Sequence, residues 1–243
     1  MTVPGDGPPA PVHHPPVSRP VAPSRLTPEL LLQAYGIGYF PMAEDRFARE
    51  VFWVRPERRG VLPVDGFHVP RSLARRVRQD AFVVRTDTAF RAVMEGCAAP
   101  QPGRWQTWIN AQVLDAYTEL HERGFAHSVE AWRGGELVGG LYGVAIGGAF
   151  FGESMFSRVT DASKVCLVHL AARLRAGGYA LHDTQFLTDH LKRFGAVELS
   201  AAAYQRRLEA ALPVRADFAA LPPQTADRQI SGATILQSIT QTS

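Results

Sequence analysis

The chain has 243 residues, of which 46% are hydrophobic and 20% are charged, and its 26 Lys and Arg against 23 Asp and Glu give a net charge of +3. This composition is typical of a soluble globular protein with one large or two modest domains, and the charge is too even to indicate polyanion binding by itself. No apolar run reaches the roughly 20 residues that span a bilayer, and the proline-rich start lacks the apolar core of a signal peptide, so we expect a cytoplasmic location.

The beginning of the chain divides into two parts. Residues 1–24 are so rich in proline that they cannot bury a core, and we expect them to be disordered. Thr27 is a suitable N-cap and Pro28 a suitable first residue for the helix that follows. Two short strands are expected on either side of a turn at residues 55–60. We interpret residues 25–65 as a small N-terminal domain.

A larger domain is predicted for residues 66–221, and it opens on a basic helix. The segment HVPRSLARRVRQ places Leu73 and Val77 on an inner face. Its cations fit contacts with nucleic-acid phosphates, but before any family is considered an ordinary solvated helix face is the preferred explanation. The outer face carries Arg71, Arg75 and Arg78.

The remainder of the larger domain alternates between helical and strand patterns. Gly96 and then Pro100 are expected to stop one helix, and Asp161 is expected to cap another. Cys97 and Cys166, which have neither disulfide nor metal-ligand spacing, are expected to be buried. Antiparallel strands with helices between them predict a mixed α/β (α+β) fold, and residues 222–243 are interpreted as a polar C-terminal tail. The expected elements are a strand at 82–87, a helix at 87–98, a helix ending at 124, a strand from 127, hairpins between 136 and 157, a helix from 163 to 177 and a strand at 181–186.

Polar groups converge in the glycine-rich stretch 137–185. Residues two apart in a strand point the same way, so Asp183 and Gln185 should share one face, and Glu153 and Met155 another. Glycine inside a strand often marks the close approach of a ligand or of another backbone. The stretch is therefore either a functional site or an ordinary β-meander packed on a helix.

With these residues in view, the chain resembles the leucyl/phenylalanyl-tRNA protein transferase family. The most specific part of the likeness is FGESMFSR followed by ASK and D-x-Q, and the matches keep the family order from about Leu26 to Leu212. The matching segments are YFPM (39–42), FHVPRSLAR (67–75), EGCA (95–98), TWI (107–109), HSVEAW (127–132), GGLYGVA (139–145), FFGESMFSR (150–158), DASK (161–164), DTQF (183–186) and GAVE (195–198).

The resemblance implies a small N-terminal domain followed by an acetyltransferase-like (GNAT) domain in a monomeric aminoacyltransferase. Members of the family move leucine or phenylalanine from aminoacyl-tRNA to the α-amine of proteins that begin with Arg or Lys, which marks those proteins for degradation. We expect neither a metal nor a cofactor, and no membrane partner. The donor is already an activated ester, and an α-amine has a pKa of about 7.7–8.0, so positioning should matter more than a strong base.

The catalytic residues implied by the resemblance are three. Asp183 and Gln185 match D-x-Q, in which a carboxylate and an amide are proposed to act together on the acceptor amine. Either they guide its proton, or they only position it while the ribose hydroxyl of the tRNA transfers the proton. Glu153 is expected to bind the amino group of the carried amino acid or to help accept an N-terminal Arg or Lys. Its structural alternative is a buried ion pair with Arg158.

A pocket for the leucyl or phenylalanyl side chain is also implied by position. Met is adaptable and suits a pocket that takes both branched and aromatic groups. The family pattern has Met at position 141, Phe at 170 and an aliphatic residue at 182, so a methionyl substrate also fits this chain. The implied pocket residues are Leu141, Phe150, Met155, Leu170 and His182.

The resemblance further implies contacts with the tRNA. Trp108 matches a tryptophan that stacks on the 3′-terminal adenine, whereas Met42 stands where the opposing wall has Trp, and Tyr117 is expected to add a polar contact. The basic helix should follow the acceptor-stem phosphates, so that binding weakens with salt. The cations concerned are Arg71, Arg75, Arg76 and Arg78.

Two other classes of function compete with this interpretation. An acetyl-CoA-dependent acyltransferase of the same fold would need a Q/R-x-x-G-x-G/A loop before the main helix, and residues 159–164 contain no glycine. A non-catalytic tRNA-binding module predicts that Asp183→Ala leaves every measurable property unchanged.

Overall fold

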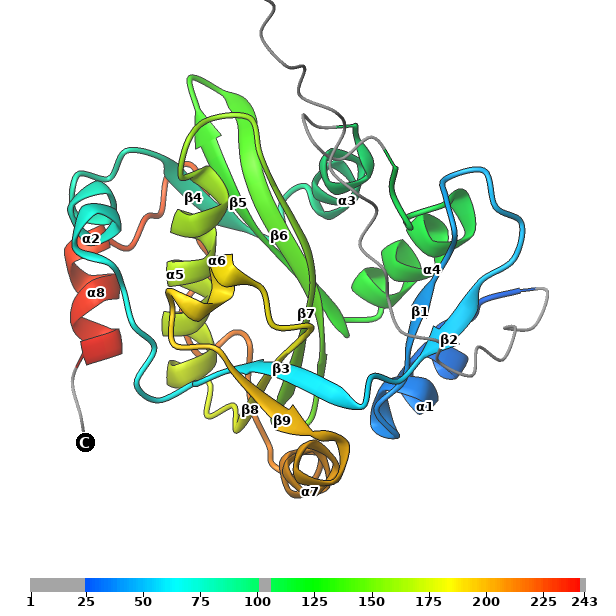
Figure 1. The fold of residues 1–243 in the computed structure, drawn as a ribbon. Coiled ribbons are helices and arrows are strands. Elements are labelled where there is room, and N and C mark those ends of the chain that lie inside the picture. Colours follow the sequence, from blue (N-terminus) through cyan, green and yellow to red (C-terminus); the bar gives the residue numbers. More distant parts are fainter. Residues whose placement is uncertain (1–24, 101–105, 241–243) are drawn as a thin grey trace, which may run out of the picture.

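The computed structural model describes residues 25–100 and 106–240, and it is built around a seven-stranded sheet (Figure 1). Only β7 and β8 run parallel among neighbouring strands of this sheet, and the other neighbours are antiparallel. The predicted disorder of residues 1–24 lies outside the described residues. In spatial order the strands are β4 (Val83–Thr86), β5 (Ala126–Arg133), β6 (Glu136–Ile146), β7 (Ala149–Ser157), β8 (Leu181–Gln185), β3 (Arg58–Leu62) and β9 (Val197–Ser200).

Helices cover both faces of the sheet (Figure 1). One face packs against α5 (Ala162–Ala176), with α2 (Arg71–Arg78) and α8 (Gly232–Thr240) beyond it. The other face packs against the second group of helices and a small two-stranded sheet, so the predicted mixed α/β class is confirmed. This second group contains α1 (Pro28–Gly36), α3 (Phe90–Ala98), α4 (Ala111–Glu122), α7 (Ala201–Ala211) and the strands β1 (Phe40–Met42) and β2 (Phe52–Val54), while the short α6 (Asp189–Lys192) follows β8.

Local signals explain several helix ends. The Thr27 hydroxyl accepts a hydrogen bond from the Leu30 amide at 3.3 Å, as the predicted N-cap requires. The helix α3 ends at Ala98, before Pro100 as predicted, but it continues past Gly96, whose missing side chain leaves room for the Phe156 ring. Asp161 occupies the predicted N-cap position of α5, but its side chain makes no cap hydrogen bond, and Ser157 Oγ accepts from the Ser163 amide of the first turn. Among the described residues, no helix is both long and apolar enough to cross a membrane.

Two of the expected domain limits differ from the structure. The strand β3 falls within the range assigned to the N-terminal domain, yet it pairs with β8 and β9 of the large sheet. The segment interpreted as a polar tail contains α8, which packs against α5 and α2. Its apolar stripe is short, which explains why the composition of the segment concealed it. The buried residues of that stripe are Ile235, Leu236 and Ile239.

A β-bulge in β7 changes the predicted side-chain pattern. Gly143 pairs with Gly152 and Tyr142 with Ser154, so Glu153 is the extra residue of the bulge. The alternation is reset there, and Glu153 points toward α1 and α4, whereas Met155 packs against the core on the α5 side. The prediction that Glu153 and Met155 share a face is therefore wrong.

A second irregularity, between Gly60 and Val61 in β3, depends on a glycine. A Cβ at Gly60 would lie 2.5 Å from the carbonyl carbon of Phe186 and 2.7 Å from the amide nitrogen of Leu187. We therefore expect Gly60→Ala to lower the free energy of unfolding by about 1–3 kcal/mol, the usual cost of overpacking. Urea titration measures this change. Gly36→Ala is the matched control, because a Cβ at Gly36 would meet no other atom within 4 Å, and equal stability of the two variants would contradict the expectation.

Candidate active site

A buried ion pair lies at the centre of the candidate site. Asp183 on β8 is fully buried, and Arg59 on β3 is 1% exposed. The guanidinium of Arg59 donates from Nε to Oδ1 at 2.9 Å and from Nη2 to Oδ2 at 2.6 Å, while Nη1 donates to the Gly38 carbonyl at 3.1 Å. The same guanidinium lies over the rings of Phe40 and Tyr204, each 4.7 Å away. Arg59 therefore joins the N-terminal segment to the large sheet.

The surroundings of this pair favour the charged form of Arg59. Burial by itself would lower the pKa of Arg59, but the adjacent Asp183 carboxylate raises it above its ordinary value. The Tyr204 hydroxyl donates to Oδ2 of Asp183 at 2.7 Å, and burial together with that carboxylate raises the pKa of the phenol. Two charges buried in this way depend on each other, since removing one leaves the other without compensation.

Gln185 connects Asp183 to the next acidic residue. Its backbone amide donates to Oδ1 of Asp183 at 2.8 Å, and its side-chain Nε2 donates to Oε1 of Glu153 at 2.9 Å. Gln185 has a φ of +57°, in the left-handed region that costs a non-glycine residue about 1–2 kcal/mol. Such strain is maintained only where the surroundings fix it, and here the Asp183 contact does so.

Glu153 lies at the bulge between two tyrosines. Tyr35 donates to Oε1 at 2.6 Å and Tyr117 to Oε2 at 3.4 Å, and the two hydroxyls also contact each other. Burial raises the pKa of Glu153 to about 7; Asp183 adds to this rise, while Tyr35, Arg59 and Tyr117 oppose it. Burial and the Glu153 carboxylate in turn raise the pKa of both tyrosines.

The strands β7 and β8 part at this cluster. Their parallel pairing covers only Ala149 with Leu181, Phe150 with His182 and Phe151 with Asp183, although both strands continue beyond it. The bulge of β7 and the end of β8 then carry the Glu153 to Gln185 hydrogen bond across the gap. The polar residues predicted to converge are thus brought together where the sheet opens.

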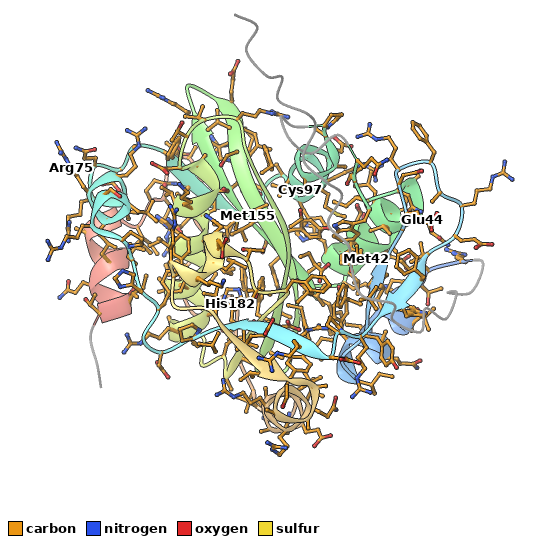
Figure 2. The ribbon with its side chains drawn as sticks, in the orientation of Figure 1. Met42, Glu44, Arg75, Cys97, Met155 and His182 are labelled. Carbon is orange, nitrogen blue, oxygen red and sulfur yellow. The ribbon has the colours of Figure 1, made fainter. Side chains whose placement is uncertain are left out.

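The residues predicted to form the apolar pocket lie in the core on the α5 side of the same strands. Leu141 and Met155 are direct cross-strand neighbours, and the rings of Phe150 and His182 meet edge to face at 5.8 Å. Leu170 of α5 belongs to the same core. His182 is 2% exposed, and burial lowers its pKa to about 4, so the imidazole is neutral near pH 7. Met155 and His182 both lie near the middle of the molecule in Figure 2.

The residues predicted to contact tRNA lie in separate places. Trp108 and Met42 are half-buried and pack on the core that contains α1 and α4, and Tyr117 is fully buried with its hydroxyl at Glu153. Arg75 is exposed on α2, and Figure 2 shows it at the left edge of the molecule, whereas Met42 lies to the right of the middle. The basic face of α2 also exposes Arg71 and Arg78, while Arg76 is half-buried near Phe82.

Sequence reasoning missed several members of the cluster and proposed one false partner. Arg158 does not pair with Glu153 in the described part of the chain, because it donates to the Leu137 carbonyl and lies over the Phe156 ring. Arg59 could have been noticed as an arginine near the start of a strand whose later residues are apolar, because a cation in such a position needs a buried partner. The missed members are Arg59, Tyr35 and Tyr204.

Comparisons with known proteins decide the family. The family model described as leucyl/phenylalanyl-tRNA protein transferase matches residues 61–209, and that of its N-terminal domain matches residues 24–57. The chain belongs to the leucyl/phenylalanyl-tRNA protein transferase family. A transferase of this name from Nitrobacter winogradskyi is 58% identical over 223 residues, which are 92% of this chain and 98% of the relative. One from Phenylobacterium zucineum is 58% identical over 213 residues, 88% of this chain and 96% of that relative.

Membership of the leucyl/phenylalanyl-tRNA protein transferase family confirms the predicted resemblance and makes the chain an aminoacyltransferase. The end of the N-terminal match, at residue 57, falls just before β3 begins at Arg58. The break between the two family matches therefore coincides with the point at which the chain enters the large sheet.

Proposed function

We propose that this chain transfers leucine or phenylalanine from aminoacyl-tRNA to the α-amine of proteins with an N-terminal Arg or Lys, and so directs them to degradation. We further propose that it acts as a monomer in the cytoplasm. The names of the relatives support aminoacyl-tRNA and protein as the two substrates. The observation that carries the proposal is the hydrogen-bonded chain from Arg59 through Asp183 and Gln185 to Glu153, located where β7 and β8 part.

An acetyltransferase-like (GNAT) arrangement is part of this proposal. It is supported by a mostly antiparallel sheet in which one parallel pair, β7 and β8, opens after three residue pairs. An opening of this kind lets a substrate reach backbone groups that a continuous sheet would pair. The helix α5, which follows β7, starts after residues 159–161, which contain no glycine and so lack the pyrophosphate loop of an acetyl-CoA enzyme.

We assign the reaction to the residues around the opening. Glu153, Gln185 and Asp183 form its polar side, and the apolar group on the α5 side receives the leucyl or phenylalanyl side chain. Trp108 and Met42 take the 3′-adenosine, and Tyr117, whose hydroxyl donates to Glu153, adds a polar contact. The cationic face of α2 follows the tRNA phosphates at the far edge of the molecule. The apolar group consists of Leu141, Phe150, Met155, Leu170 and His182.

The proposal is tested by measuring transfer while the amino acid on the tRNA and the first residue of the acceptor peptide are varied. Leucyl-, phenylalanyl-, methionyl- and alanyl-tRNA are each incubated with peptides beginning with Arg, Lys or Gly. We expect label from leucyl- and phenylalanyl-tRNA on the Arg and Lys peptides only, none from alanyl-tRNA, and no product with acetyl-CoA; label from methionyl-tRNA would show that the side-chain pocket also accepts Met. Transfer to the Gly peptide at the same rate, or acetylation of the Arg peptide, would contradict the proposal.

Stacking on the 3′-adenine gives a separate prediction. We expect Trp108→Ala to weaken the binding of aminoacyl-tRNA by about 1–3 kcal/mol, because a base that stacks on an aromatic ring contributes that much. Met42→Trp should strengthen binding, since it adds an aromatic ring at the position proposed as the opposite wall. Filter binding with leucyl-tRNA measures both. If the two variants bind like the parent chain, Trp108 and Met42 are not the adenine site.

A further inference from the structure

The carboxylates of Asp183 and Glu153 differ in whether they can accept a proton from an incoming amine. The Asp183 oxygens together receive hydrogen bonds from two guanidinium nitrogens of Arg59, the Tyr204 hydroxyl and the Gln185 amide. An ionised carboxylate has about four lone-pair positions, so these donors fill it, and its exposed fraction is 0%. An incoming amine finds no position on Asp183 to which it could give a proton.

Glu153 is placed differently. It is only half-buried, and it lies on the bulge where β7 leaves β8. Tyr35, Tyr117 and Gln185 donate to it, while the charged groups that act on it from β8 and β3 are Asp183 and Arg59. Its pKa of about 7 lies close to that of an α-amine, which is the match that favours proton transfer between the two.

We propose that Glu153 is the base that takes the proton of the attacking α-amine, and that Arg59 is a positioning residue that acts through Asp183. This inference rests on the proposed function. The amine nitrogen forms a bond to the ester carbonyl carbon, and its excess proton passes to a carboxylate oxygen of Glu153. The bond between that carbon and the ribose oxygen then breaks, and the ribose oxygen receives the proton from Glu153. The carboxylate is regenerated, and no other reactant is needed.

The role of Arg59 follows from its four contacts. It binds both oxygens of Asp183 and the Gly38 carbonyl with different nitrogens, and it is held between the rings of Phe40 and Tyr204. Asp183 in turn fixes Gln185 in its left-handed conformation, and Gln185 orients Glu153. Lysine supplies the charge as a single point and cannot make this planar set of contacts.

The test is the pH dependence of single-turnover transfer from leucyl-tRNA. The acceptor is a peptide whose first residue is the α-aminooxy analogue of arginine, a weak base that stays neutral across the range, so that its own titration does not contribute. With the parent chain we expect the rate to rise with pH through an apparent pKa near 7. In Glu153→Gln we expect this rise to disappear and the rate above pH 7 to fall at least tenfold, with tRNA affinity unchanged.

Each outcome decides one claim. If the parent chain transfers leucine to an ordinary Arg peptide but Glu153→Gln keeps the same pH rise, Glu153 is not the base and the proposed function stands. If the parent chain transfers no leucine at all, the proposed function itself fails. If Glu153→Gln has a raised KM for leucyl-tRNA and an unchanged rate at saturation, Glu153 binds the carried amino acid and is not the base.

Arg59 is tested with Arg59→Lys, which keeps the positive charge. We expect the rate at saturation to fall at least tenfold, with the KM for leucyl-tRNA within twofold of the parent and the apparent pKa still near 7. A general loss of structure would change the KM and the thermal unfolding profile as well. Full activity in Arg59→Lys would overturn the positioning role.

Discussion

Asp183→Ala is expected to lower the free energy of unfolding by about 3–5 kcal/mol, because it leaves the Arg59 guanidinium buried without a counter-charge. Arg59 is 1% exposed, so water cannot replace the lost carboxylate. Urea denaturation at pH 7 measures the change. Under conditions where the variant remains folded, turnover should also be lost while tRNA affinity is nearly retained, since Asp183 is fully buried on β8 whereas the basic face of α2 is exposed.

The double variant Arg59→Met/Asp183→Leu separates stability from activity. Apolar residues of similar volume often replace a buried ion pair without a net loss of stability, so this chain should regain most of what Asp183→Ala loses. It should not regain turnover, because Gln185 has lost the acceptor that fixes its backbone. If Asp183→Ala unfolds at the urea concentration of the parent chain, the pair does not have the structural role described above.

Two buried histidines make the fold sensitive to acid. Burial lowers the pKa of His169 and of His182 from an ordinary value of 6.5 to about 4. A group with a lowered folded-state pKa contributes stability that is present above pH 6.5 and is lost as the pH falls toward 4. At 1.36 kcal/mol per pKa unit, each histidine accounts for about 3 kcal/mol, a large part of the 5–15 kcal/mol that stabilises a typical domain.

Glu153 has the opposite effect on stability as the pH falls. Its pKa is raised from 4.5 to about 7, so its contribution to stability is present below pH 4.5 and is lost as the pH rises through 7. We therefore expect the loss of stability between pH 7 and pH 4.5 to be steeper in Glu153→Gln than in the parent chain, and shallower in the double variant His169→Gln/His182→Gln. Urea midpoints at the two pH values measure all three. Equal losses in all three chains would contradict the assignment.

Local rules predicted those parts of the fold that depend on neighbours in the sequence. The N-cap at Thr27, the inner face of α2 with Leu73 and Val77, and the strand at 181–186 all follow from spacing and capping chemistry. Gly96 was misjudged because its role is to admit a ring from residue 156, far along the chain. The bulge at Glu153 was missed for a similar reason, since it depends on register between two strands.

Prediction from local sequence patterns was also limited at the candidate site, where partners are far apart in the sequence. The strand pattern of the glycine-rich stretch singled out Asp183, Gln185 and Glu153, the family resemblance supplied their roles, and the structure joins them by successive hydrogen bonds. Arg59 is 124 positions from Asp183, and Tyr35 is 118 positions from Glu153. The pairing of β3 with β8 brings Arg59 to Asp183, and the packing of α1 against the sheet brings Tyr35 to Glu153.

The most direct measurement is the rate at which label passes from leucyl-tRNA to a peptide that begins with Arg, compared among the parent chain, Asp183→Asn and Glu136→Gln. Glu136 is an exposed acid in the β5–β6 hairpin, so its variant controls for the exchange of a carboxylate for an amide. We predict equal rates for the parent chain and Glu136→Gln, and a rate roughly a hundredfold lower for Asp183→Asn with tRNA affinity retained. A folded Asp183→Asn chain that transfers leucine at the parental rate would contradict the account.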